Sequence, residues 1–225
     1  VLYRSEKKQH RFSANANHLS RLRFLIDVRN PILIDLPMPI RTNRLQLKPR
    51  QQGEGRLIAE AIQESRPELL PWMPFAVNPP TAEQAEIRVR QHMAEYLLRT
   101  SCTLSIYTPD GKTFLGSTGF HRMNWDVRRF EIGYWIRTSF AGKGYVTEAV
   151  NAQTRYLFEV LRARRVEIRC DSQNLGSVAI MQKLGFVNEA LFRNDDVDLE
   201  GNPRDTVVAV RYGIEGLPKL DGLSW

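Results

Sequence analysis

The stretch Glu131–Val150, reading EIGYWIRTSFAGKGYVTEAV, restricts the fold more than any other part of the sequence. It begins like a strand, continues like a helix, and places Gly142 and Gly144 between the two. Glycine adopts positive φ and lets backbone amides approach a ligand closely, and the amides at a helix start favour anions. The stretch therefore predicts a strand–turn–helix unit with a candidate phosphate cradle at its turn.

The common phosphate motifs do not fit this turn. A P-loop would need glycine where Arg137 stands and a hydroxyl residue where Gly144 follows Lys143, and a dinucleotide fingerprint would need glycine at Thr147. What remains is a short turn whose amides, from about residue 142 to residue 146, point along the helix dipole at a pyrophosphate. The alternative is that the glycines only shape a strand–helix junction.

The remaining chain alternates between predicted strands and helices, which indicates one mixed α/β domain without internal repeats. Thr81-Ala-Glu-Gln84 is a capping box that opens a helix, and Pro109-Asp110-Gly111 is the turn of an antiparallel hairpin. We expect strands at 44–48, 103–107, 113–120, 130–137, 165–170, 186–193 and 205–213, helices at 56–64, from Thr81, at 145–160 and at 175–183 with Gly185 as its cap, and a polar loop at 194–205.

Composition limits the classes of protein that remain. A chain of 225 residues with 42% hydrophobic residues can bury one core, and no apolar run approaches the length of a membrane span. Cys102 and Cys170 are too few for a disulfide scaffold. We therefore expect a soluble, cytoplasmic protein with no membrane partner.

The positive charge is concentrated at the N-terminus. Residues 1–30 hold seven basic and two acidic residues, a net +5, which leaves +2 of the total +7 for the rest of the chain. A nearly balanced folded part argues against direct nucleic-acid binding. We expect a basic extension at 1–37, a domain at 38–215 and a tail at 216–225; alternatively, the extension is an organellar transit peptide or lies upstream of a natural start at Met38.

Several segments together resemble a known family. They are RTNRLQLKP, LLPWMPF at 69–75, GYWI, GKGYVTEAV, the run CDSQNLGS at 170–177 and AIMQKLGF at 179–186. In this order, over about Pro39–Tyr212, they resemble the GNAT acyltransferase superfamily, in the branch of RimJ and RimL, which acetylate the N-terminal amine of ribosomal proteins. The resemblance implies the GNAT fold: a mixed central sheet of about six or seven strands with a splayed parallel pair, flanked by helices.

The resemblance also implies a coenzyme site for acetyl-CoA and no metal. The cradle for its pyrophosphate would be Ala141, Gly142, Lys143, Gly144, Tyr145 and Val146, although the family's usual glutamine or arginine is Ala141 here and its small sixth residue is Val146. Asn174 would bind the pantetheine amides and Ser177 would protonate the departing thiolate. The alternative is that Asn174 only caps a helix and Ser177 is a polar residue of its first turn.

The general base is the least defined part of the implied site. Similar enzymes use a carboxylate where Glu131 begins the strand before the cradle, and the alternative is an ordinary charge at a strand edge. His121 and His92 are the further candidates, with His92 expected on a helix surface. Cys170 is not expected to act as a nucleophile, because no basic residue is placed to ionise it and burial raises the pKa of a thiol.

The acceptor side is expected from the first half of the chain and from the GYWI strand. Trp72 and Trp135 are large amphipathic side chains that would floor an acceptor cleft, with core packing as the alternative. Tyr134 should lie on the opposite face of its strand from Trp135 unless a bulge intervenes. The family resemblance implies such a bulge, which frees an amide for the thioester oxygen.

These observations predict an N-acetyltransferase that moves an acetyl group by direct attack of a primary amine, most simply a protein N-terminal α-amine such as that of a ribosomal protein. A small amine, such as an antibiotic, amino sugar, polyamine or amino acid, is the alternative acceptor. A non-catalytic protein that binds acyl-CoA or nucleic acid is the alternative class. The sequence leaves a monomer and a homodimer open.

Overall fold

The computed structural model describes residues 30–225, and the chain divides into one unit ending at Ile34 and a second spanning Asp35–Trp225. In the first unit, the short helix η1 (Pro31–Leu33) begins at Asn30, whose Oδ1 accepts a hydrogen bond from the Ile32 amide at 3.2 Å. The basic extension expected at 1–37 therefore falls mainly outside the described residues. The described strands, and the described helices other than η1, all lie in the second unit.

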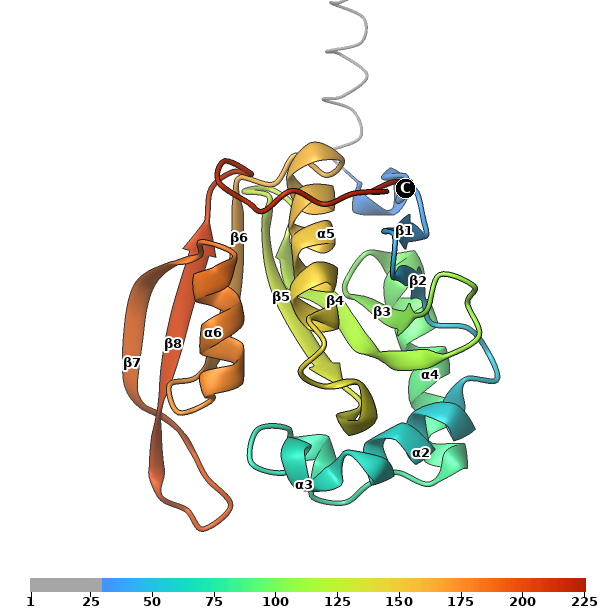
Figure 1. Ribbon diagram of the computed structural model, residues 1–225, viewed down its shortest axis with the longest axis vertical. Coiled ribbons are helices and arrows are strands. Elements are labelled where there is room, and N and C mark those ends of the chain that lie inside the picture. The colour runs from blue at the N-terminus through green and yellow to red at the C-terminus, as the bar shows by residue number, and fades with distance from the viewer. Residues whose placement is uncertain (1–29) are drawn as a thin grey trace, which may run out of the picture. The chain divides into compact units, whose positions relative to one another are not determined.

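The second unit is built on one eight-stranded sheet with the order β1-β2-β3-β4-β5-β6-β8-β7 (Figure 1). All neighbouring strands pair antiparallel except β5 and β6, which are parallel. The strands are β1 (Ile40–Arg41), β2 (Gln46–Pro49), β3 (Cys102–Tyr107), β4 (Phe114–Asn124), β5 (Arg129–Ile136), β6 (Arg165–Asp171), β7 (Val187–Val197) and β8 (Pro203–Arg211).

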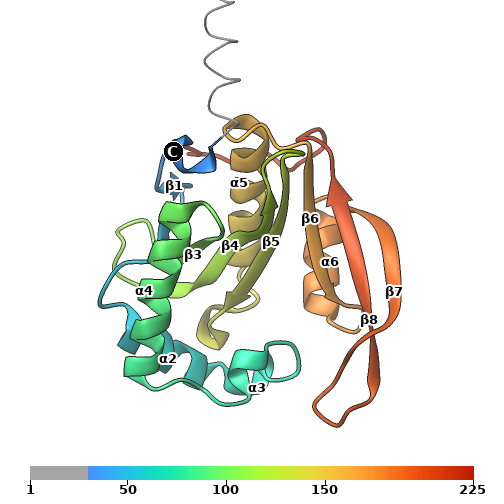
Figure 2. The same ribbon diagram turned by 180° about the vertical axis from the view of Figure 1, so that it is seen from behind.

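Helices cover both faces of this sheet. Figures 1 and 2 show α5 and α6 on one face and α2 and α4 on the other, with α3 below the sheet on the side of α2. The helices are α2 (Gly55–Glu64), α3 (Arg66–Leu69), α4 (Ala82–Leu98), α5 (Tyr145–Glu159) and α6 (Leu175–Lys183), with the short turns η2 (Pro74–Ala76) and η3 (Thr138–Phe140). The predicted mixed α/β fold is confirmed.

Local sequence signals explain several element boundaries. Thr81 accepts a hydrogen bond from the Gln84 amide and Gln84 accepts one from the Thr81 amide, so the predicted capping box opens α4. The predicted hairpin joins β3 and β4 through the turn at 108–113. Gly185 follows α6 with a φ of +65°, the left-handed conformation typical of a glycine that ends a helix.

Three expectations differ from the structure. The sheet has eight strands rather than the expected six or seven. The additional strand, β1, is only two residues long and too short to give an alternating pattern in the sequence. The polar loop expected at 194–205 shrinks, because β7 resumes beyond an irregularity near Asn194 (φ +51°), whose amide donates to Asp205 Oδ1 at 3.0 Å. The bulge expected near Tyr134 is absent from the β4–β5 ladder, which runs in register from His121 paired with Glu131 to Gly116 paired with Ile136.

The parallel pair is short, and this decides where a ligand can enter. β5 and β6 pair only at Arg129 with Arg165, Phe130 with Val166 and Glu131 with Glu167. Beyond Glu131 the two strands diverge, as Figure 1 shows, so their facing backbone groups are no longer paired to each other. The predicted splayed pair is therefore present and opens directly after Glu131.

The chain's last segment packs on the domain. Leu217 is buried, Asn151 Nδ2 donates to the Pro218 carbonyl at 2.9 Å, and Ser224 forms a bridge with Arg41. The ring of Trp225 meets the buried ring of Tyr156 at 5.9 Å between centroids. These contacts tie the segment after β8 to α5 and to the edge strand β1.

Candidate active site

A cavity of about 530 Å³ lies where β5 and β6 part. The glycine turn, the first turns of α5 and α6 and the end of β5 contribute to its lining. The lining includes every predicted site residue except Lys143 and Glu131, namely Trp72, Trp135, Ala141, Gly142, Gly144, Tyr145, Val146, Asn174 and Ser177. The glycine turn and the start of α6, which belong to separate segments of the sequence, thus meet in one cleft.

The turn before α5 has the geometry of an anion cradle. Gly142 and Gly144 have φ of +72° and +78°, a conformation that ordinary side chains rarely adopt. A Cβ atom at Gly142 would meet no atom within 4 Å, so the space above the turn is open. Gly144 is the N-cap of α5 with no side-chain cap, so backbone amides at this helix start lack side-chain partners and suit an anion.

Arg44, in the turn between β1 and β2, braces the glycine turn from the side. Its Nη1 donates to the Lys143 carbonyl at 3.2 Å, and its Nε donates to Glu148 Oε2 at 2.6 Å. Thr42 Oγ1 donates to the other oxygen of Glu148 at 2.5 Å, and the Arg44 guanidinium lies 4.9 Å from the centre of the Tyr145 ring. Sequence reasoning missed this role, because Arg44 and Glu148 lie 104 residues apart and no local pattern links them.

Lys143 directs its side chain away from the cleft lining. Its Nζ donates to the Ser139 carbonyl at 3.0 Å and lies 5.4 Å from the centre of the Phe140 ring. Of the predicted cradle residues, Lys143 therefore contributes backbone rather than its ammonium group to the turn.

Asn174 and Ser177 stand at the start of α6, facing the end of β5. Asn174 is the N-cap, and its Oδ1 accepts a hydrogen bond from the Ser177 amide at 3.1 Å. The cap uses only Oδ1, which leaves the Nδ2 donor of Asn174 for a ligand. Tyr134 and Ser177 both line the cleft, burial raises the pKa of Tyr134 to about 12, and its buried hydroxyl has no hydrogen-bond partner among residues 30–225.

Glu131 occupies the last paired position before β5 and β6 diverge. Its side chain is 17% exposed, and its Oε2 lies 3.5 Å from Arg122 Nη1 and 3.4 Å from Arg169 Nε. Burial raises the pKa of this carboxyl group, while the two arginines act in the opposite direction. Glu131 lines a smaller cavity of about 380 Å³, together with Trp72, and not the cleft of about 530 Å³.

Histidines line a further cavity on the α4 side of the sheet, of about 630 Å³. His92 was expected on a helix surface, and this prediction is wrong: the ring is half-buried, and burial, with Arg50 and Arg88 nearby, lowers its pKa to about 3. The helical spacing of α4 could not reveal that His92 lines a cavity shared with residues of β4. His121 Nδ1 lies 2.8 Å from Ser101 Oγ, and burial lowers the pKa of its ring as well.

The two tryptophans hold different positions at the cleft. Trp135 packs against the core, with its ring centre 5.9 Å from Phe114 and 6.0 Å from Phe75, and it also lines the cleft. Trp72 stacks with the Arg204 guanidinium at 4.6 Å and faces both the cleft and the smaller cavity. Cys170 is half-buried, and burial raises the pKa of its thiol to about 11, which disfavours a thiolate nucleophile.

The described residues, 30–225, contain no group of three or more histidine, cysteine, aspartate or glutamate side chains placed to hold a metal ion. None of their helices is long and apolar enough to cross a membrane.

Comparison with known proteins gives a consistent result. Residues 44–187 match the family described as "Acetyltransferase (GNAT) domain". The chain is 31% identical over 155 residues, 68% of this chain and 83% of the relative, to the Bacillus subtilis (strain 168) protein named "Putative ribosomal N-acetyltransferase YdaF". It is 25% identical over 176 residues, 74% of this chain and 87% of the relative, to the Escherichia coli (strain K12) protein named "[Ribosomal protein uS5]-alanine N-acetyltransferase".

A solved structure shows the same fold. The structure of RimL, described as a ribosomal L7/L12 α-N-protein acetyltransferase in complex with coenzyme A, superposes with a TM-score of 0.72 at 17% identity. The superposition covers 77% of this chain and 96% of that chain. At this identity the likeness establishes the fold alone.

Proposed function

Because this chain belongs to the GNAT acetyltransferase family, we propose that it transfers the acetyl group of acetyl-CoA to the α-amine of a protein N-terminus. The observation that carries the proposal is the cleft of about 530 Å³, which joins the glycine turn to Asn174 and Ser177 at the point where β5 and β6 part. The open space above Gly142 and the uncapped start of α5 fit the pyrophosphate of the coenzyme.

In the proposed reaction the acceptor nitrogen attacks the thioester carbonyl and the carbon–sulfur bond breaks. Backbone amides of the turn at 142–146 hold the pyrophosphate, and Asn174 Nδ2 orients the pantetheine arm. Ser177 donates a proton to the leaving thiolate, and Tyr134 lines the same cleft. The proton lost by the attacking amine passes to Glu131, directly or through water.

The protonation chemistry favours an α-amine over a lysine side chain. An α-amine with a pKa of about 7.7–8.0 is roughly one-tenth neutral at pH 7, whereas a lysine amine near 10.4 is neutral about 0.04% of the time. Burial raises the pKa of the Glu131 carboxyl group against the effect of two arginines, but the group is still a carboxylate, and both cavity histidines have lowered pKa values, so each candidate base is weak relative to a lysine amine. A weak base suffices only for an amine that is already partly neutral.

The proposal is tested by following acetyl-CoA consumption with three kinds of acceptor. The first is a peptide with a free N-terminus and one internal lysine, the second is the same peptide with its N-terminus formylated, and the third is a set of small amines. We expect acetylation of the first peptide alone, with mass spectrometry locating the acetyl group on the α-amine.

Two results would contradict the proposal. Acetylation of the formylated peptide on lysine would show that a stronger base acts in the site. Turnover of small amines without turnover of any free peptide would make the protein a small-molecule acetyltransferase.

A further inference from the structure

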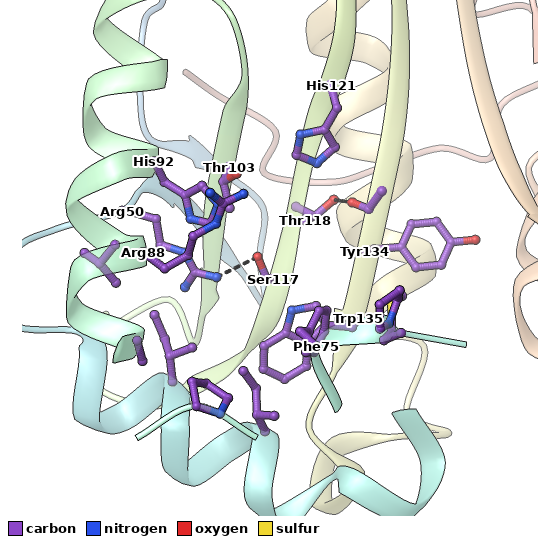
Figure 3. A pocket seen from close by; sticks show the side chains of 18 of the residues that line it. Arg50, Phe75, Arg88, His92, Thr103, Ser117, Thr118, His121, Tyr134 and Trp135 are labelled. Carbon is purple, nitrogen blue, oxygen red and sulfur yellow. Dashed lines mark hydrogen bonds between the residues drawn. The ribbon is translucent and has the colours of Figure 1, made fainter. Parts of the chain in front are cut away.

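The cavity of about 630 Å³ next to the coenzyme cleft has an unusual distribution of charge. Its charged lining residues are Arg50 and Arg88, and among the described residues that line it there is no carboxylate. Apolar side chains from α2, α4 and the η2 turn form the rest of the wall, with the hydroxyl groups of Thr103, Ser117 and Thr118. Figure 3 shows Arg50, Arg88 and His92 on the α4 side and His121, Thr118 and Tyr134 on the β4–β5 side.

Arg50 provides a buried charge that its neighbours neutralise only in part. Its side chain is 4% exposed, with Nη1 bonded to Ser105 Oγ at 2.9 Å and Nη2 to Ser117 Oγ at 2.8 Å. Its buried Nε has no hydrogen-bond partner among residues 30–225. Its ion-pair partner, Glu54, lies 3.9 Å away, beyond hydrogen-bond distance, and is shared with Lys48 at 3.9 Å.

The protonation of this cluster follows from its shared positive charge. Burial lowers the pKa of Arg50 to about 10, which still leaves the guanidinium charged at pH 7. Burial is the largest cause that lowers the pKa of both His92 and His121, and Arg88 is among the cations that lower both further. The two rings are therefore neutral at pH 7. The wall therefore offers cations and neutral donors, and it would repel a second cation.

The cavity adjoins the site of the reaction. Met73, Tyr134 and Trp135 line both this cavity and the coenzyme cleft. His121 packs over Gly133, where a Cβ atom would lie 3.3 Å from His121 Cδ2, so the imidazole stands close to the β5 backbone beyond Glu131. The shared lining residues place the cavity next to the cleft.

We propose that this cavity binds a carboxylate of the acceptor, carried next to the reacting amine, and so selects peptides with an acidic side chain in their first two residues. The inference rests on the proposed function for the nature of the amine. It follows from the two arginines that line the cavity and the lack of lining carboxylates. The same positive lining disfavours polyamines and other polycationic acceptors, and it lowers the pKa of a nearby ammonium toward the reactive neutral form.

The test compares kcat/KM for two series of otherwise identical peptides, with Glu, Gln or Lys at position 1 in one series and at position 2 in the other. We expect Glu to exceed Lys by about tenfold or more in at least one series, because like charges brought together in a partly buried site cost more than opposite ones. Gln should fall between them. Equal kcat/KM for Glu and Lys in both series would overturn the inference.

A pair of charge-reversal variants separates the cavity from the general surface charge. Arg88→Glu removes a cavity cation whose side chain is 61% exposed, so the variant should fold, and its preference should shift toward the Lys peptides. Arg56→Glu, on α2, changes a side chain that is 83% exposed and does not line the cavity, and it should keep the wild-type preference. Equal shifts in the two variants would also overturn the inference.

The design distinguishes this inference from the proposed function. Acetylation of free peptides without regard to charge would leave the protein N-terminus as acceptor and remove the carboxylate site. Acetylation of small amino acids in preference to their amides, with no turnover of peptides, would keep the carboxylate site and remove the protein N-terminus as acceptor.

Discussion

Replacing Gly142 by aspartate should separate the affinity for acetyl-CoA from the stability of the fold. Gly142 has a φ of +72°, and a Cβ atom there would meet nothing within 4 Å, so the added side chain fits in the free protein. The conformational cost of a non-glycine residue at this φ is about 1–2 kcal/mol, and aspartate is among the residues that tolerate it best. For a domain of this size that cost lowers Tm by only a few degrees.

The effect on binding is expected to be larger. A carboxylate about 5 Å from a phosphate oxygen repels it by about 1–3 kcal/mol for an effective dielectric constant between bulk water and a protein surface. That energy corresponds to a rise in Kd of about 5- to 150-fold. Isothermal titration with coenzyme A gives Kd, and a thermal melt of the same preparation gives Tm.

Gly201 supplies the matched control. It has a φ of +86°, it also has nothing within 4 Å of a built Cβ atom, and it lies in the turn between β7 and β8 rather than in the cleft. Gly201→Asp should lower Tm by a similar amount and leave Kd unchanged. A folded Gly142→Asp protein with wild-type Kd would refute the cradle.

Three further predictions concern the same site. Ser177→Ala should lower kcat by about 10- to 1,000-fold with little change in the Kd of acetyl-CoA, whereas a loss of stability with normal turnover would reduce Ser177 to a helix-start residue. Glu131→Gln should abolish the fall of kcat/KM at acid pH, which arises because the protonated base is inactive. Burial raises the pKa of this carboxyl group, so the fall should be centred above the usual carboxylate pKa of about 4.3. Persistence of the acid fall in the variant would exclude Glu131 as the base. Arg44→Ala should raise the KM for acetyl-CoA more than that for peptide, and Arg44→Lys should not rescue it, because one ammonium cannot hold both the Lys143 carbonyl and Glu148; full rescue by lysine would show that only the charge matters.

Local signals predicted most of the fold. The capping box at Thr81, the hairpin turn at 109–111 and the predicted helix at 175–183 all appear where the sequence places them, because each depends on residues within a few positions of one another. β1 and the end of β7 were missed for a different reason, because their pairing partners are close in the sequence: Arg41 pairs with Gln46 and Val197 with Pro203. The two residues of β1 give no alternating pattern, and the Asn-Asp-Asp run at 194–196 is polar and exposed, as a loop would be.

The site was predictable only where it coincides with a motif. The glycine turn and the start of α6 lie in quoted segments, and the structure brings them to one cleft. The Arg44 brace and the cationic cavity join residues from separate thirds of the chain, so their geometry depends on the folded sheet. His92 illustrates the same limit, since helical spacing alone did not reveal that it lines a cavity shared with His121 of β4.

The three-pair contact between β5 and β6 makes the coenzyme a candidate structural element as well as a substrate. The half-sheet of β1–β5 and the half-sheet of β6, β8 and β7 have direct ladder bonds to each other only at 129–131 and 165–167. A pantetheine arm laid between the strands beyond Glu131 would act as a surrogate strand, pairing backbone groups that the protein leaves facing each other. Release of the coenzyme would then break strand-like pairing within the sheet. Slow hydrogen exchange at the β5 amides that face β6 would report bound coenzyme rather than the stability of the fold.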